Sequence, residues 1–202
     1  MISMALFFSG SGGNALNLLA ACRDGRIPAQ VAAAVASTTK AGGIPRLQAE
    51  GVPVSVVLRS AHPDDGAFSR ACYQRAEAAG AAFIALCGWL KKLEVPPAWQ
   101  GRIVNIHPAL LPAFGGPGMW GMHVHRAVLA AGAAESGCTV HLVDNLYDHG
   151  RILAQAAHSG HRYPQSGHGN SFANGYDENM VPGYRVRRYS ARASGYRRIS
   201  WA

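Results

Sequence analysis

Short apolar runs alternate with amphipathic segments along residues 1–157 of the chain. The apolar runs are typical of buried strands, and they predict strands at 5–10, 30–38, 52–58, 81–89, 101–108, 138–144 and 151–157. Apolar positions at helical spacing predict helices at 15–25, 44–51, 64–80 and 123–137. Because strands alternate with helices, we expect an α/β fold built on a doubly wound, mostly parallel, Rossmann-like sheet.

Several classes of protein are disfavoured by the composition. Hydrophobic residues make up 49% of the 202 residues, but no apolar run approaches the roughly 18 residues of a membrane span. The first apolar run leads directly into a glycine loop and lacks the features of a secretory signal. The four cysteines are widely spaced, which argues against both a disulfide framework and a zinc site. We therefore expect a soluble cytoplasmic protein.

The C-terminal segment differs in character from the rest of the chain. Residues 158–202 have few aliphatic side chains and no helical or strand periodicity, and they hold seven arginines against two acidic residues. Most of the formal net charge of +8 therefore lies there. We interpret residues 1–157 as the folded domain and 158–202 as an irregular basic tail, either a disordered divergent tail or a product of out-of-frame translation. A shifted reading of residues 171–180 permits codons for an amphipathic helix, which favours the second interpretation.

Polar side chains interrupt the end of the strand predicted at 101–108. Asn105 and His107 are separated by one residue, so both side chains point to the same side of an extended chain. A carboxamide can donate to a developing oxyanion, while an imidazole polarises a carbonyl or relays a proton. Histidine at a strand end is often structural, but Pro108 and Pro112 stiffen the following loop and favour a functional site. Open α/β folds bind their ligands at such strand ends.

Two aspartates follow the strand predicted at 138–144. Asp144 and Asp148 come at its end and just before Gly150. A carboxylate beside an imidazole fixes its tautomer and favours its protonated form. Either aspartate could equally be a solvated turn residue, and spacing alone does not choose between them.

The glycine-rich segment SGSGGN, residues 9–14, lies between the first predicted strand and the first predicted helix. Backbone N–H groups at a helix N-terminus are suited to a phosphate group. The glycine spacing excludes a P-loop and matches a dinucleotide fingerprint only weakly. Phosphate binding and a plain tight turn are the two interpretations.

Four segments together carry a family resemblance. They are SGSGGN, CGWLKKL, NIHPALLPAF with GMHVHRAVLAAG behind it, and ESGCTVHLVDNLYDHGRILAQ. Their order and spacing over about residues 4–157 resemble the folate-dependent formyltransferases, specifically the phosphoribosylglycinamide formyltransferases. The resemblance implies formyl transfer from 10-formyltetrahydrofolate to the amine of glycinamide ribonucleotide in de novo purine biosynthesis. The amine attacks directly through a tetrahedral intermediate, and no metal is implied.

The resemblance also assigns roles to particular residues. It implies a catalytic trio of Asn105, His107 and Asp148, and so chooses Asp148 over Asp144. Asn105 would hold the oxyanion, His107 would polarise the formyl oxygen or relay a proton, and Asp148 would pair with His107 and assist deprotonation of the amine. The implied binding residues are Gly12, Gly13 and Asn14 for the phosphate, and Trp89, Leu90, Lys91, Leu93, Val143 and Asp144 for folate. Without the resemblance, Trp89 would be a core residue and Lys91 part of a solvated face.

The partners implied are small molecules, with no membrane and no nucleic acid, and the chain would be a monomer or a homodimer. One alternative is a formyltransferase for another amine, such as initiator methionyl-tRNA or a sugar nucleotide, although those relatives generally carry an additional domain. A second is a catalytically impaired fold whose Arg/Tyr tail binds RNA. The family usually has a C-terminal helix with an acidic residue that contacts the amine substrate, and no residue of that helix can be carried over to residues 158–202.

Overall fold

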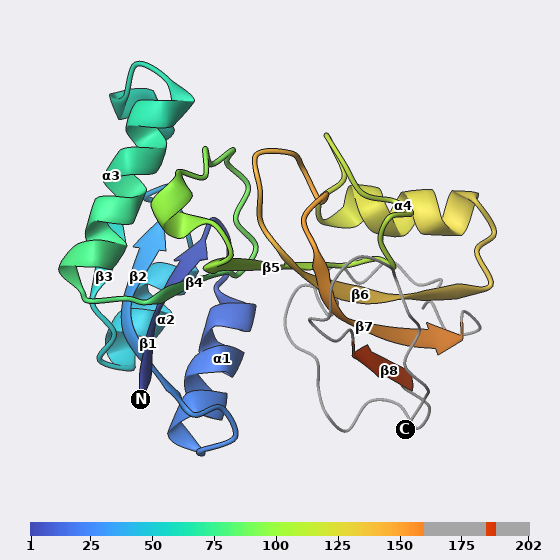
Figure 1. Ribbon diagram of the computed structural model, residues 1–202, viewed down its shortest axis with the longest axis horizontal. Coiled ribbons are helices and arrows are strands. Elements are labelled where there is room, and N and C mark those ends of the chain that lie inside the picture. The colour runs from blue at the N-terminus through green and yellow to red at the C-terminus, as the bar shows by residue number, and fades with distance from the viewer. Residues whose placement is uncertain (160–184, 189–202) are drawn as a thin grey trace. The chain divides into compact units, whose positions relative to one another are not determined.

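The structure of the protein is a computed structural model that describes residues 1–159 and 185–188. The described chain divides into two compact units, residues 1–104 and residues 105–159 with 185–188. The boundary falls inside strand β5 (Ile103–His107), which begins in the first unit and ends in the second. Figure 1 shows the elements of each unit.

The first unit alternates strands and helices. Its elements are β1 (Ile2–Phe8), α1 (Gly13–Arg23), β2 (Ala29–Ala36), α2 (Gly43–Ala49), β3 (Val54–Val56), the short 3-10 helix η1 (Arg59–Ala61), α3 (Asp65–Ala78), β4 (Phe83–Leu86) and the 3-10 helix η2 (Pro97–Trp99). The strand order is β3-β2-β1-β4, followed by β5. The pairs β1/β2, β1/β4 and β2/β3 are parallel. This arrangement confirms the predicted α/β fold with a mostly parallel sheet.

Strand β1 lies at the centre of this sheet. Leu6 is in register with Ala34 of β2 on one side and with Ala85 of β4 on the other. The last four residues of the strand are fully buried. A strand covered on both faces needs a continuous apolar run rather than an alternating one, which is the pattern of ALFF.

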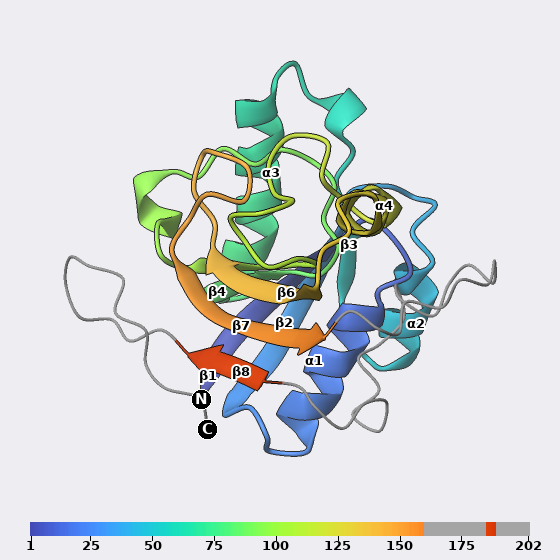
Figure 2. The same cartoon turned by 90° about the vertical axis from the view of Figure 1, so that its right-hand side faces the viewer.

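Helices cover both faces of the sheet in the first unit. Helices α1 and α2 lie on one side of the strands and α3 on the other (Figures 1 and 2). On the first side, Leu6 and Phe8 pack with Leu19 of α1 and Leu47 of α2. Successive side chains of a strand alternate between faces, so Phe7 points to the other side. The doubly wound prediction is therefore confirmed.

Helix α3 begins where the sequence predicts. The Asp64 carboxylate caps its first turn by accepting a hydrogen bond from the Ala67 N–H at 2.6 Å. The helix buries Phe68, Cys72 and other residues that recur every three or four positions. An N-cap followed by one apolar stripe is what made this helix visible in the sequence.

The second unit contains α4 (Met122–Ala130), β6 (Glu135–Leu142), β7 (Ile152–Ser159) and β8 (Arg185–Arg188). The strands β6 and β7 form an antiparallel pair, with Cys138 in register with Ala156, and β8 is antiparallel to β7. In the strand order, β5 precedes β6, β7 and β8. Val124 and Val128 of α4 pack with Ala109, on the loop after β5, in a small core.

One prediction about this unit was wrong. The helix predicted over 123–137 ends at Ala130, because the chain turns at Gly132, whose φ is +59°. The segment after it already belongs to β6. The irregular tail predicted at 158–202 falls mostly outside the described residues; within it, residues 185–188 form β8, which pairs with the edge of β7. The other tail residues from 160 onward lie outside the described part, and the domain boundary at 157 stays a prediction. No helix within the described ranges is long and apolar enough to cross a membrane.

Candidate active site

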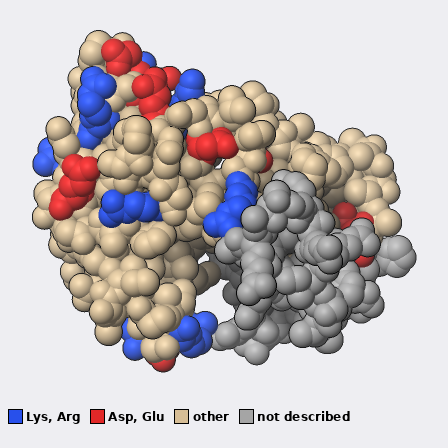
Figure 3. Space-filling model, in the orientation of Figure 1, with Lys and Arg blue, Asp and Glu red and all other residues tan. Residues whose placement is uncertain are grey.

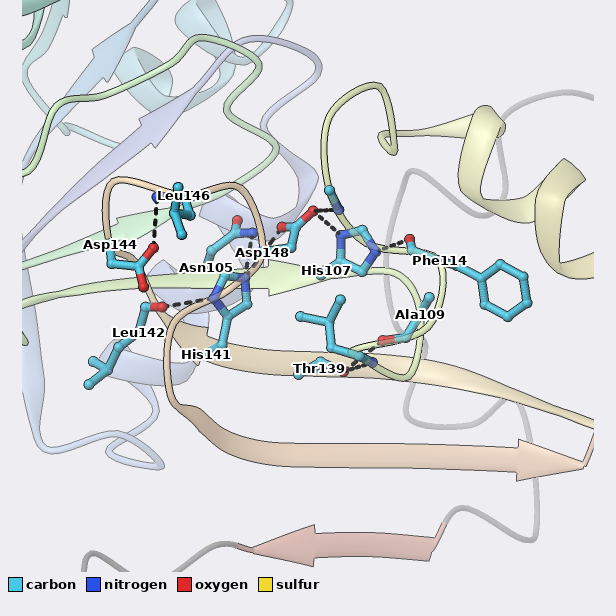
Figure 4. Close-up of polar contacts among 12 residues, drawn as sticks. Asn105, His107, Ala109, Phe114, Thr139, His141, Leu142, Asp144, Leu146 and Asp148 are labelled. Atoms are coloured by element: carbon cyan, nitrogen blue, oxygen red, sulfur yellow. Dashed lines mark hydrogen bonds and ion pairs between the residues drawn. The ribbon is translucent and has the colours of Figure 1, made fainter. Parts of the chain in front are cut away.

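Two of the predicted catalytic side chains, Asn105 and His107, lie at the end of β5. His107 is buried, with only 3% of its surface exposed, and Asn105 is partly buried. Figure 4 shows both on the same side of the strand, beside Asp148 and His141. The period of two in an extended strand therefore brings the carboxamide and the imidazole to one place.

Both ring nitrogens of His107 have acceptors nearby. Nε2 donates to the carbonyl oxygen of Phe114 at 2.8 Å, and Nδ1 lies 3.5 Å from a carboxylate oxygen of Asp148. Burial lowers the pKa of His107 below its ordinary value of 6.5, against the opposite effects of Asp148 and of the Phe114 carbonyl. The neutral ring that donates through Nε2 leaves Nδ1 able to take up a proton, and the carboxylate then stabilises the imidazolium.

Asp148 is held in an uncommon backbone conformation. Its φ is +52°, in the left-handed region that few residues other than glycine adopt. Its carboxylate accepts a hydrogen bond from the Gly116 N–H at 3.0 Å and lies 3.5 Å from Nε2 of His141. Burial alone would raise the pKa of Asp148, but His141, the Gly116 N–H and His107 together lower it below the ordinary value. The carboxylate is therefore kept ionised, as a proton acceptor requires.

His141 belongs to the site, although the sequence analysis did not predict a role for it. Its ring is 2% exposed, Nδ1 donates to the Leu142 carbonyl at 2.8 Å, and Nε2 accepts from the Asn105 carboxamide at 3.1 Å. Asn105 therefore contacts His141, whose Nε2 atom also lies 3.5 Å from the Asp148 carboxylate. An imidazole at an inward position of an apolar strand, VHLV, is the signal that could have revealed it.

A buried polar pair supports the loop that follows β5. The Thr139 hydroxyl donates to the Ala109 carbonyl at 2.7 Å and accepts from the Leu111 N–H at 3.0 Å. The Gln155 amide donates to the Leu111 carbonyl at 2.8 Å and to the Thr139 hydroxyl at 3.1 Å. These contacts fix the backbone of the loop that supplies both the Phe114 carbonyl and the Gly116 N–H to the site.

Asp144 has different partners from Asp148. It binds Nδ1 of the exposed His149 at 2.9 Å and accepts from the Leu146 N–H at 2.8 Å. Burial would raise the pKa of Asp144, but these hydrogen bonds lower it. The structure thus brings Asp148, and not Asp144, to His107. Val143, like Asp144, is partly buried.

The glycine loop of the first unit is shaped by its glycines. Gly12 precedes α1 with a φ of +74°, and a Cβ atom there would lie 2.9 Å from the Cα of Gly43. Gly13 and Asn14 open the helix, and no side chain caps its first turn. The Arg46 guanidinium holds the loop by donating to the Ser11 carbonyl at 2.9 Å. The first N–H groups of a helix have no partners within the helix itself, so they can bind an anion.

The segment after β4 combines buried and exposed side chains. Trp89 packs between Phe68, at 5.8 Å between ring centroids, and Phe7, at 5.2 Å, as the alternative core interpretation expected. Its Nε1 atom is buried with no hydrogen-bond partner among the described residues. Leu90 and Lys91 are exposed, and Leu93 is buried. No group of three potential metal ligands was found within residues 1–159 and 185–188.

The fold and the cluster at the end of β5 define an α/β protein with an amide, imidazoles and a carboxylate at a strand end. Comparison with known proteins gives it a family. Residues 2–159 match the formyl transferase family, and the chain belongs to it.

Individual relatives agree with this assignment. The chain is 41% identical over 157 residues to the chloroplastic phosphoribosylglycinamide formyltransferase of Arabidopsis thaliana, covering 76% of this chain and 54% of the relative. It is 31% identical over 158 residues to the Haemophilus influenzae phosphoribosylglycinamide formyltransferase, covering 77% and 72%. The crystal structure of glycinamide ribonucleotide transformylase 1 from Symbiobacterium toebii superposes with a TM-score of 0.73 at 37% identity, covering 79% and 74%. The chain spans about half the length of its plant relatives, 54% in Arabidopsis and 49% in Vigna unguiculata.

Proposed function

We propose that the protein transfers a formyl group from 10-formyltetrahydrofolate to the amine of glycinamide ribonucleotide, a step of de novo purine biosynthesis. The observation that supports this most directly is the cluster of Asn105, His107, His141 and Asp148 in a member of the formyl transferase family. The relatives named above carry that activity in their names.

The carboxamide suits the charge that develops in this reaction. The amine nitrogen bonds to the formyl carbon, and the carbonyl oxygen becomes an oxyanion in the tetrahedral intermediate. The Asn105 amide N–H groups are donors, and His141 holds one of them in place at 3.1 Å. Preorganised donors of this kind stabilise the oxyanion without reorganising during the reaction.

His107 and Asp148 handle the proton. The attacking amine must lose a proton, and N10 of the folate must gain one when its bond to the formyl carbon breaks. Asp148 is ionised and 3.5 Å from His107, so the pair accepts the proton from the amine, directly or through water, and returns it to the leaving nitrogen. His107 in its charged form also polarises the formyl oxygen.

The binding residues belong to separate elements. The N–H groups of Gly12, Gly13 and Asn14 would hold the ribonucleotide phosphate, because they open α1 without a side-chain cap. Bound 10-formyltetrahydrofolate supplies the formyl group. Exposed Leu90 and Lys91 would contact it, and buried Leu93 would support them.

Three further residues complete the proposed folate contacts. Trp89 would contribute its ring, and Val143 and Asp144 would contribute their backbone.

Small molecules are the proposed partners, bound by a monomer or a homodimer. In Figure 3, Lys and Arg side chains on the described part of this face are interspersed with Asp and Glu. A cytoplasmic location stays a prediction, and the plant relatives are named as chloroplastic.

The test is formyl transfer by the purified 202-residue chain. The chain would be mixed with 10-formyltetrahydrofolate and glycinamide ribonucleotide, and the deformylated folate followed by absorbance while the formylated product is identified by mass. We expect product from the wild type and a rate lower by about 100-fold or more from Asn105→Ala, which lacks the oxyanion donor. Initiator methionyl-tRNA and an amino-sugar nucleotide would be offered in parallel. Formylation of either of these and not of glycinamide ribonucleotide would overturn the proposal.

A further inference from the structure

Ser9 joins the glycine loop to two other segments of the first unit. It follows β1 directly and begins the SGSGGN loop. Its hydroxyl oxygen accepts a hydrogen bond from the Ser37 hydroxyl at 2.7 Å and another from the Leu90 N–H at 2.9 Å. Its own N–H donates to the Gly88 carbonyl at 3.1 Å. One residue therefore contacts the chain after β2 and the chain after β4.

The contacts with Gly88 and Leu90 have a geometric consequence. They bind both ends of a three-residue turn whose middle residue is Trp89, and Gly88 has a φ of +76°. The turn is thus fixed against Ser9 by one backbone and one side-chain hydrogen bond. Ser37, 3% exposed, donates to the same Ser9 oxygen from the segment after β2, independently of the bond from Leu90.

The two segments that Ser9 joins are those proposed to bind the two substrates. Gly12, Gly13 and Asn14 lie three to five residues after Ser9, and Leu90 begins the exposed part of the folate segment. Hydrogen bonds between segments distant in sequence hold backbone groups at a fixed separation. A two-substrate reaction needs such a separation, because misplacement by about 1 Å lowers its rate strongly.

We propose that Ser9 is a positioning residue: it holds the glycine loop and the segment after β4 at the separation that binding of the two substrates requires. This inference rests on the proposed function. Ser9 acts through the backbone of Leu90 and of its own loop, and takes no part in the chemical step.

The experiment measures binding of each substrate separately by calorimetry. Ser9→Ala removes the acceptor for Leu90, so both tetrahydrofolate and glycinamide ribonucleotide should bind about tenfold more weakly. Ser9→Cys keeps a similar shape with a poor acceptor and should show the same loss for both ligands. It also provides a second route should the alanine variant fold poorly.

Ser37→Ala is the matched control. It also removes a serine hydroxyl, and with it the hydrogen bond between Ser37 and Ser9, but it leaves the hydrogen bond between Ser9 and Leu90 in place. We expect its dissociation constants to stay within about twofold of the wild type. Thermal unfolding of all variants separates positioning from stability, since a merely structural role would lower the unfolding temperature without changing either dissociation constant.

The outcomes are distinct. Unchanged binding by both Ser9 variants, weakening of one ligand alone, or an equal loss in Ser37→Ala would each overturn the inference while leaving the proposed function intact. The wild type serves as the reference for function. If it bound both ligands but formylated no glycinamide ribonucleotide, the proposed function would fail, and the binding comparison would still decide the role of Ser9.

Discussion

The two units of the protein present their proposed functional groups in different ways. The first unit depends mainly on its backbone: a glycine loop with a positive φ at Gly12, and a segment after β4 that is held by hydrogen bonds to Ser9 and presents Leu90 and Lys91. The second unit uses side chains: His107 and His141 are buried, and the largely buried Asp148 carboxylate lies 3.5 Å from each ring. The difference teaches that substrate binding here would depend on chain conformation, whereas the chemistry would depend on the identity of a few side chains.

Substitutions in the two units should therefore change different kinetic constants. A backbone change in the glycine loop alters how well a ligand fits, which is a change in KM. An isosteric side-chain change in the buried cluster leaves the fit intact and alters the chemical step, which is a change in kcat.

The largest effect is expected for Asp148→Asn. The amide keeps the shape of the side chain but cannot accept the proton that His107 passes on, so kcat should fall by about a thousandfold. Asp144→Asn is the matched control, because that carboxylate binds the exposed His149 instead. Its kcat should stay within about fivefold of the wild type in steady-state assays. Equal losses in the two variants would contradict the choice of Asp148.

Gly12→Ala should give the next largest effect. The residue has a φ of +74°, and the new Cβ would lie 2.9 Å from the Cα of Gly43, so the loop must shift. We expect KM for glycinamide ribonucleotide to rise at least about tenfold, with a much smaller change in kcat. Gly10→Ala is the control, since nothing lies within 4 Å of its added Cβ. A fall in kcat without a change in KM would remove the distinction between the units.

Gln155→Leu tests the support of the catalytic loop. The substitution leaves the Leu111 carbonyl and the Thr139 hydroxyl without the amide donor, and should lower the free energy of unfolding by about 1–3 kcal/mol. Denaturant titration measures this change. The exposed Gln100→Leu should change stability by less than about 0.5 kcal/mol. Similar values for the two variants would show that the buried pair does not support the loop.

The smallest effect is a pH dependence of stability. The folded-state pKa of Asp148 lies below the ordinary value of 3.8, so its ionised form stabilises the fold above that pH. This stabilisation is lost as pH falls from about 4 through the lowered pKa. Unfolding of the wild type and of Asp148→Asn, measured from pH 7 downward, should therefore converge in acid. A constant difference between the two curves would contradict the direction of the shift.

The first unit could be predicted from sequence in most of its detail. The runs ALFF and IAL are apolar without interruption and match the buried parts of β1 and β4, and Asp64 marks the start of α3. These signals are local, since each depends on a few neighbouring residues. Helix α4 was predicted too long because AAGAAESG has helical composition, while its conformation is decided by pairing with β7.

The candidate site was less accessible to sequence. Spacing left Asp144 and Asp148 equivalent, and only the positive φ of Asp148 and its approach to His107 separate them physically. His141 and Gln155 each bind residues more than 30 positions away, and contacts over such distances leave no periodicity in the chain. Sequence patterns predict helices and strands, whereas the hydrogen-bond partners of a buried polar group are known only from the complete fold.

Residues that contact one another in the candidate site are far apart in the sequence, and this distance affects the rate of folding. Asn105 and His141 are 36 residues apart, and Gly116 and Asp148 are 32 apart. Such contacts require a long loop to close before they return any stabilisation, and pairings of this kind form slowly in folding. Regain of enzymatic turnover during refolding should therefore lag behind the recovery of helix measured by circular dichroism. The time at which enzymatic activity returns would therefore report when the last tertiary contacts form.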